Sequence, residues 1–162
     1  MNNTIKPNPD KSKRPNVGIG IFMLNKNKDK FLLGKRIKEQ VYGLPGGALE
    51  HYETFECSAK REIEEEVGVL IEDDSRIKLL GCFNSIRKEF SYHWVGVYMI
   101  VYLTEEEEIS VRNCEEDKCE GWIWISFEEM MNMWESLFYP LKDFINFYKL
   151  KSMDDIKRLS EM

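Results

Sequence analysis

Short runs in which apolar residues alternate with polar residues or glycines recur along the chain, a pattern typical of β-strands. The first two runs cover residues 17–24 and 30–36, and a turn-forming stretch rich in Asn and Lys joins them. This arrangement predicts a β-hairpin. Later runs predict three further strands, over residues 77–88, 92–103 and 121–126.

A different periodicity follows the hairpin, since apolar residues recur every fourth position from Phe55 to Val67. This spacing predicts a helix over residues 54–67 with one buried stripe. Thr54 is suited to cap its amino end, and Gly68 is suited to a left-handed stop. The stripe consists of Phe55, Ala59, Ile63 and Val67.

The second half of the chain predicts two more helices, over residues 127–134 and 141–150. We expect the acidic run at 105–108 to be a solvated loop, and the charged end from 151 to fray. Strands and helices mix without strict βαβ alternation, which indicates an α/β (α+β) fold with a mixed sheet between helices. The expected organisation is a disordered tail (1–14), a single domain (15–150) and a charged carboxyl-terminal end (151–162).

Composition narrows the classes of partner. The 162 residues contain 43% hydrophobic and 32% charged residues, which is typical of one globular domain. The formal net charge is −6, so neither duplex nucleic acid nor an anionic membrane is a favoured partner. No run approaches the roughly 20 apolar residues of a membrane span. Residues 1–14 lack the apolar core of a signal peptide, and the cytoplasm is the expected compartment.

The four cysteines show no CxxC spacing, and the chain has only two histidines. Zinc sites are usually built from such pairs, so we expect reduced thiols and no zinc.

The candidate chemistry lies in residues 47–69, where Glu62, Glu65 and Glu66 share one helix face. Like charges at this spacing repel, so a bound cation would stabilise them. Mg²⁺ prefers oxygen ligands and binds through one or two carboxylates together with substrate phosphates. A bare acidic run would instead be a solvated helix face.

The residues before this helix favour the ligand-binding interpretation. Pro45 fixes one φ angle, while Gly46 and Gly47 permit backbone geometries closed to other residues. A loop of this kind can turn its peptide groups toward a ligand, and Gly46 can offer a backbone oxygen to a metal.

Together these residues resemble the Nudix box, Gly-x5-Glu-x7-Arg-Glu-U-x-Glu-Glu-x-Gly-U, in which U is a bulky aliphatic residue. The resemblance implies an α/β/α sandwich in which the box forms a loop, a helix and a loop. It also implies metal-assisted hydrolysis of a diphosphate. The matching residues are Gly47, Glu53, Arg61, Glu62, Ile63, Glu65, Glu66, Gly68 and Val69.

The resemblance also implies roles for these residues. Glu62 and Glu66 would be the principal ligands of Mg²⁺, for which Mn²⁺ can substitute, and Glu65 would be a further ligand or the general base. Arg61 and Glu53 would orient the carboxylates through a charge-assisted pair, or form a structural salt bridge, or both. A further metal ligand is expected after the box, with Glu116 and Glu120 as candidates.

Sequence similarity to MutT-type nucleotide diphosphatases extends over roughly residues 15–147, and it implies a base held between aromatic rings. Trp124, Phe138 and Tyr139 stand at the matching positions, with core packing as the alternative, above all for Trp124. Lys35 and Arg36 would contact phosphates beside Gly47, or would be surface cations. The departures from the usual pattern are Gly43, Ala48 and Tyr52, which are expected to reshape the base end of the cavity.

The predicted function is therefore Mg²⁺-dependent hydrolysis of a nucleoside triphosphate, including modified purines, to a monophosphate and pyrophosphate. Two alternatives stay open. One is a Nudix hydrolase of another nucleoside-diphosphate-linked, pterin or prenyl diphosphate substrate, and the other is a non-catalytic nucleotide-binding module. A homodimer is also left open by the sequence.

Overall fold

The computed structural model of the chain describes residues 13–162, so the tail predicted for residues 1–14 lies almost wholly outside the described residues. Six strands form one sheet in the order β3-β2-β1-β5-β4, with β6 paired to β2. Of the pairs, β1–β5 is parallel and the others are antiparallel, as a mixed sheet requires. The strands are β1 (Asn16–Leu24), β2 (Phe31–Arg36), β3 (Val41–Gly43), β4 (Lys78–Arg87), β5 (Tyr92–Tyr102) and β6 (Cys119–Ile125).

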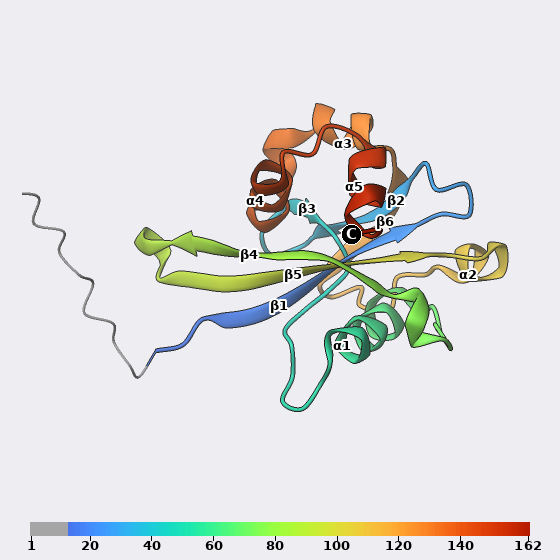
Figure 1. Cartoon of the computed structure of the whole chain (residues 1–162), viewed down its shortest axis with the longest axis horizontal. Coiled ribbons are helices and arrows are strands. Elements are labelled where there is room, and N and C mark those ends of the chain that lie inside the picture. Colours follow the sequence, from blue (N-terminus) through green and yellow to red (C-terminus); the bar gives the residue numbers. More distant parts are fainter. Residues whose placement is uncertain (1–12) are drawn as a thin grey trace, which may run out of the picture.

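Helices cover both faces of this sheet (Figure 1). On one face lies α1, which a π-helical turn, η1, continues. On the other face lie α3, α4 and α5. The helices are α1 (Phe55–Glu62), η1 (Ile63–Val67), α2 (Glu105–Ser110), α3 (Phe127–Asn132), α4 (Tyr139–Tyr148) and α5 (Met153–Leu159), with 3-10 turns η2 (Asp74–Arg76), η3 (Lys88–Phe90) and η4 (Trp134–Ser136).

Alternation along β1 supplies both hydrophobic cores. Ile21 and Met23 pack into the core on the α1 side, while Phe22 and Leu24 pack into the core on the α4 side. All four are fully buried. The predicted three-layer arrangement of a mixed sheet between helices is therefore confirmed.

The two strands of the predicted hairpin separate soon after their turn, since β1 and β2 pair only at Leu24 and Phe31. The loop at residues 45–49 takes the edge of β1 that this separation exposes. Ile19 N donates to Gly47 O at 2.8 Å, and Ile21 N donates to Pro45 O at 2.9 Å. These bonds hold the glycine-containing loop in an extended form between the sheet and α1.

Both predicted ends of the first helix are confirmed. Thr54 Oγ1 accepts a hydrogen bond from Cys57 N at 3.2 Å, and Gly68 has a left-handed φ of 70°. The predicted stripe is wrong at Phe55, which is 38% exposed. A four-residue spacing advances about 40° past each full turn, so the two ends of such a stripe face different directions.

Two expectations for charged segments are wrong. Residues 105–110 form α2, because Thr104 and Glu107 make a reciprocal capping box at its start. The carboxyl-terminal end does not fray, since Ser152 caps α5 and Ile156 is fully buried beneath it. In each segment most residues are charged, but one residue, Thr104 or Ser152, caps a helix. Among residues 13–162, no helix is long and apolar enough to cross a membrane.

Candidate active site

Two pockets adjoin on either side of the extended loop. The first, about 440 Å³, has five aromatic side chains in its lining and is called the aromatic pocket, and the second, about 370 Å³, has five glutamates and is called the carboxylate pocket. They share Arg36 and Leu44 as well as the loop residues 46–48. A single ligand with an aromatic part and an anionic part can therefore occupy both.

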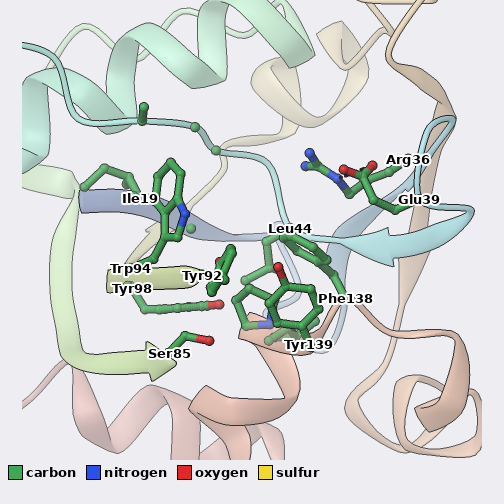
Figure 2. A pocket seen from close by; sticks show the side chains of 18 residues that line it. Ile19, Arg36, Glu39, Leu44, Ser85, Tyr92, Trp94, Tyr98, Phe138 and Tyr139 are labelled. Carbon is green, nitrogen blue, oxygen red and sulfur yellow. Dashed lines mark hydrogen bonds and ion pairs between the residues drawn. The ribbon is translucent and has the colours of Figure 1, made fainter. Parts of the chain in front are cut away.

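The aromatic pocket owes its depth to glycines in β1. A Cβ atom at Gly18 would lie 3.0 Å from Trp94 Cε3, and one at Gly20 would lie 3.1 Å from Tyr98 Cε1. Because these glycines have no side chain, the two rings of β5 can lie across β1. Figure 2 shows Trp94 and Phe138 on opposite sides of the pocket. This arrangement suits a planar ring, which gains from offset or edge contacts with aromatic neighbours.

The α4 side of the same pocket carries Phe138 and Tyr139, at the start of the helix. Tyr92 packs edge-on against Tyr139 with a centroid distance of 5.0 Å. The guanidinium of Arg36 lies 4.8 Å from the centre of the Phe138 ring. This cation–π contact fixes Arg36 at the passage between the two pockets.

Ser85 contributes a polar group to the aromatic pocket, on the side away from Arg36 (Figure 2). Ser85 Oγ donates a hydrogen bond to Asp143 Oδ2 at 2.6 Å, and Arg87 Nη2 donates to Asp143 Oδ1 at 2.7 Å. Since the Ser85 proton is directed to a carboxylate, its oxygen lone pairs can accept from an N–H group of a ligand.

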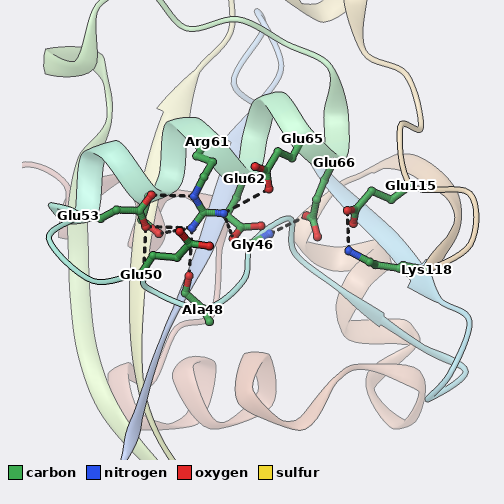
Figure 3. A network of polar contacts seen from close by, with 11 residues as sticks. Gly46, Ala48, Glu50, Glu53, Arg61, Glu62, Glu65, Glu66, Glu115 and Lys118 are labelled. Carbon is green, nitrogen blue, oxygen red and sulfur yellow. Dashed lines mark hydrogen bonds and ion pairs between the residues drawn. The ribbon is translucent and has the colours of Figure 1, made fainter.

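The carboxylate pocket is organised around Arg61 (Figure 3). Its guanidinium holds Glu53 in a two-pronged pair, with Nε–Oε1 at 2.7 Å and Nη2–Oε2 at 3.0 Å. The remaining donor, Nη1, reaches Glu62 at 2.6 Å and Glu65 at 3.3 Å, and Nη2 also donates to Ala48 O at 3.1 Å. Arg61 therefore fixes the positions of Glu53 and Glu62 relative to the loop and contacts Glu65 more loosely.

Glu66 meets the loop from the π-helical turn. Gly46 N donates to Glu66 Oε2 at 2.8 Å, and among the described residues the other carboxylate oxygen accepts no hydrogen bond. The backbone carbonyl of Glu66 accepts from Trp122 Nε1 at 3.3 Å and from Cys114 N at 3.1 Å. Hydrogen bonds from residues outside the helix thus stabilise the π-helical turn η1, and π-helical turns are frequent at functional sites.

Burial and ion pairing shift the pKa values of these carboxylates in opposite directions. Burial raises the pKa of Glu66 to about 7, with Glu62 and Glu115 contributing in the same direction. Burial also raises the pKa of Glu62, against the opposing effect of Arg61. By contrast, the Arg61 guanidinium lowers the pKa of Glu53 to about 2.

The side chains fit a hard divalent cation that is completed by a ligand. Within residues 13–162, no three Asp, Glu, His or Cys side chains converge into a closed metal site. Glu62, Glu66 and Glu115 nevertheless line one pocket, and a Cβ atom at Gly47 would lie 2.7 Å from Glu62 Cδ. The glycine keeps that space open beside the carboxylate. An open, all-oxygen set fits Mg²⁺, which retains waters and takes phosphate ligands.

The structure brings most of the sequence-predicted residues to these two pockets and separates three. Glu62, Glu65, Glu66, Arg61, Gly46 and Gly47 line the carboxylate pocket, with Glu53 bonded behind them. Phe138 and Tyr139 line the aromatic pocket, and Arg36 lines both.

Lys35, Glu116 and Trp124 line neither pocket. Lys35 pairs with Glu120 at 2.8 Å, because neighbouring residues of β2 face opposite sides of the sheet. Trp124 packs against the core on the α1 side, whereas Phe138 lies at the start of α4 on the other face of the sheet. Glu116 is exposed. The sequence offered Glu116 and Glu120 as the further metal ligand, but the glutamate of this segment that lines the pocket is Glu115.

The three departures from the usual pattern are also located. Gly43 lines the carboxylate pocket and Ala48 lines both, whereas Tyr52 is 95% exposed and lines neither. Tyr52 therefore does not shape the base end of the cavity.

Sequence reasoning missed Glu115, Lys118 and the β5 aromatics. Asn113 could have indicated the turn that positions Glu115, since asparagine favours Asx turns and its Oδ1 accepts from Glu115 N at 3.3 Å. The β5 residues carry a period-two signal, because Tyr92, Trp94, Gly96 and Tyr98 alternate onto one face.

Comparisons with known proteins agree with this geometry. A family model described as NUDIX domain matches residues 14–144. An RNA pyrophosphohydrolase of Hydrogenovibrio crunogenus is 28% identical over 128 residues, which are 70% of this chain and 74% of that protein.

Solved structures give the same result. A MutT NUDIX hydrolase from Burkholderia pseudomallei has a TM-score of 0.62 at 31% identity, covering 72% of this chain and 87% of that one. A MutT protein from Methanosarcina mazei has a TM-score of 0.61 at 19% identity, covering 92% and 96%. The second likeness is one of fold alone.

Proposed function

This chain belongs to the NUDIX domain family of diphosphate hydrolases, and we propose that it cleaves nucleoside triphosphates to a monophosphate and pyrophosphate with Mg²⁺. The observation that carries the proposal is the junction of the two pockets at Arg36 and residues 46–48. The base would lie among the aromatic rings, and the phosphates would lie among the carboxylates.

Glu62 and Glu66 would hold the ion, with Glu115 and the Gly46 carbonyl beside them. That carbonyl is suitable because the Gly46 amide already points into the pocket, and among the described residues its oxygen accepts no hydrogen bond. When bound, the ion supplies charge neutralisation and polarises phosphoryl oxygens.

The chain's own residues position the groups and accept the proton. Water attacks phosphorus, the P–O bond between the α and β phosphates breaks, and pyrophosphate leaves. Glu65 accepts the proton of the attacking water. Its side chain is 54% exposed and has one long contact with Arg61, so it can approach a water. Glu53 is unsuited to this role, since the low pKa of its carboxyl makes it a weak base.

The adjacent pair Glu64 and Glu65 provides a matched test. Both are exposed, but only Glu65 lines the carboxylate pocket. Glu65→Gln is expected to lower kcat about 100- to 1,000-fold without changing the thermal midpoint, because positioned proton transfer contributes on that scale. Glu64→Gln is expected to keep wild-type turnover. Full turnover by Glu65→Gln would remove the proposed role of this residue.

A second candidate substrate is the triphosphorylated 5′ end of RNA, because the Hydrogenovibrio crunogenus relative is an RNA pyrophosphohydrolase. The bond chemistry is the same. The net charge of −6 provides no general attraction for a long polyanion. We therefore favour free nucleotides.

A substrate panel separates these possibilities from the remaining alternatives. Normal and modified nucleoside triphosphates, a 5′-triphosphorylated oligonucleotide, and dinucleotide, pterin and prenyl diphosphates would be incubated with Mg²⁺ or with chelator. Metal-dependent release of pyrophosphate from nucleoside triphosphates supports the proposal. Metal-independent nucleotide binding without product would instead support a non-catalytic module.

A further inference from the structure

A polyphosphate in the carboxylate pocket needs cationic side chains that can reach it. Among residues 13–162, three basic residues line this pocket, namely Arg36, Arg61 and Lys118. Arg61 is committed to Glu53, Glu62, Glu65 and the Ala48 carbonyl, and releasing it would leave the largely buried carboxylates of Glu53 and Glu62 unpaired. Only Arg36 and Lys118 can therefore turn to a phosphate without dismantling the site.

Lys118 combines a fixed backbone with a mobile charge. Its carbonyl accepts from Ile37 N at 2.9 Å, and its amide donates to Glu115 O at 3.0 Å, so the main chain is tied to the end of β2. Its side chain is 66% exposed, and its ammonium pairs with Glu115 Oε1 at 2.6 Å. An exposed lysine pair of this kind contributes little to stability and can exchange at small cost.

Glu115 is also coupled to the central carboxylates. Its charge adds to the burial that raises the pKa of both Glu62 and Glu66, and its hydrogen bond to Lys118 raises the pKa of that ammonium. Figure 3 shows Glu115 beside Glu66, with Lys118 at the edge of the same group. The lysine charge therefore lies at the edge of the carboxylate cluster, in the pocket that would hold the phosphates and not in the aromatic pocket.

We propose that Lys118 binds the terminal phosphate of the substrate and makes the site selective for triphosphates over diphosphates. This proposal rests on the proposed function. Arg36 lines both pockets, so it would contact the phosphate nearest the nucleoside, whereas Lys118 lines only the carboxylate pocket. On substrate binding the ammonium exchanges Glu115 for a phosphate oxygen, a partner to which lysine is suited as a compact point charge.

The first test measures binding without a nucleoside and without turnover. Inorganic triphosphate, pyrophosphate and phosphate would be titrated by calorimetry into the wild-type protein with Ca²⁺, and then into Lys118→Ala. Lys118→Ala is expected to bind triphosphate about tenfold more weakly, the low end for a charge-assisted hydrogen bond, and pyrophosphate less than threefold more weakly. Lys35→Ala is the matched control, because Lys35, in β2, also forms an ion pair with a glutamate but lines neither pocket.

The second test uses metal alone. Mn²⁺ binding, followed by electron paramagnetic resonance, is expected to be unchanged or tighter in Lys118→Ala, because Glu115 loses a competing cation. A merely structural role for Lys118 would instead weaken Mn²⁺ binding together with all three anions.

The outcomes separate this proposal from the proposed function. If the wild-type protein shows no metal-dependent turnover of nucleoside triphosphates, the proposed function is wrong. The calorimetric comparison would still decide the role of Lys118. Equal loss of triphosphate and pyrophosphate affinity, wild-type affinity in Lys118→Ala, or no triphosphate binding by the wild-type protein would each overturn the role of Lys118.

Discussion

Glu66 lies in the proposed metal site, yet replacing it with glutamine is expected to stabilise the metal-free protein. Burial raises the pKa of Glu66 from 4.5 to about 7, so the ionised carboxylate is less favourable in the native state than in the unfolded chain. At a pH above both pKa values, the ionised Glu66 lowers the free energy of unfolding by about 3 kcal/mol, since each pKa unit corresponds to about 1.4 kcal/mol. Because Glu66 is still partly exposed to solvent, which screens the charge, we expect about 2 kcal/mol.

The sign follows from proton binding. As the pH rises from about 5 to 8, the unfolded chain has already lost the Glu66 proton while the native state still holds it, so native stability falls. Glutamine carries no charge, and its amide oxygen can still accept from Gly46 N. Glu66→Gln should therefore be more stable than the wild-type protein by about 2 kcal/mol near pH 8, and by almost nothing near pH 5.

Urea denaturation in chelator at several pH values measures this difference, with Glu64→Gln as the exposed control. Excess Mg²⁺ should then stabilise the wild-type protein more than Glu66→Gln, since a ligand that binds only the native state adds to its stability. A variant less stable than the wild-type protein near pH 8 would refute the reasoning. A pH-independent difference, or equal stabilisation by Mg²⁺, would refute it as well.

Two further predictions concern other parts of the fold. Glu107→Gln should lower the free energy of unfolding by about 1–2 kcal/mol at neutral pH, because Arg76 holds this carboxylate with bonds of 2.6 and 2.7 Å and lowers its pKa. The loss should shrink as the pH falls through that depressed pKa, and a loss that persists in urea titrations at low pH would contradict this account. Phe138→Leu should raise KM for a nucleoside triphosphate about tenfold, since base–aromatic stacking contributes on that scale, with kcat little changed. Affinity for inorganic triphosphate is the control and should change much less than KM, since only the Arg36–ring contact is lost there. An unchanged KM would exclude Phe138 from the base site.

The sequence was sufficient where local periodicity or a fixed frame decides the outcome. The spacing from Gly47 to Val69 places Arg61 and three glutamates on one short helix, and the structure brings them together as that spacing requires. Thr54 and Gly68 bound the helix by local hydrogen bonding and backbone conformation alone. These features need no knowledge of distant contacts.

The sequence was insufficient where strand register decides. Lys35 and Arg36 are adjacent cations of similar chemistry, and only the pairing of β2 with β3 and β6 determines which one enters the pockets. Trp124 pairs with Leu32 and shares its face toward α1, so it cannot meet Phe138 on the opposite face. Likewise, the turn at Asn113 directs Glu115 rather than Glu116 inward.

The charge of the carboxylate pocket constrains how it can bind a polyphosphate. Of the described part of the chain, five glutamates and three basic residues line it, a formal balance of −2 with Arg61 already committed. An incoming phosphate chain would therefore be repelled unless a cation entered before it or with it. Metal and nucleotide must then strengthen each other's binding by the same factor, since coupling between two ligands is reciprocal. The buried carboxylates that destabilise the empty site would thus make it dependent on a metal, and Lys118 would make binding depend on the length of the phosphate chain as well.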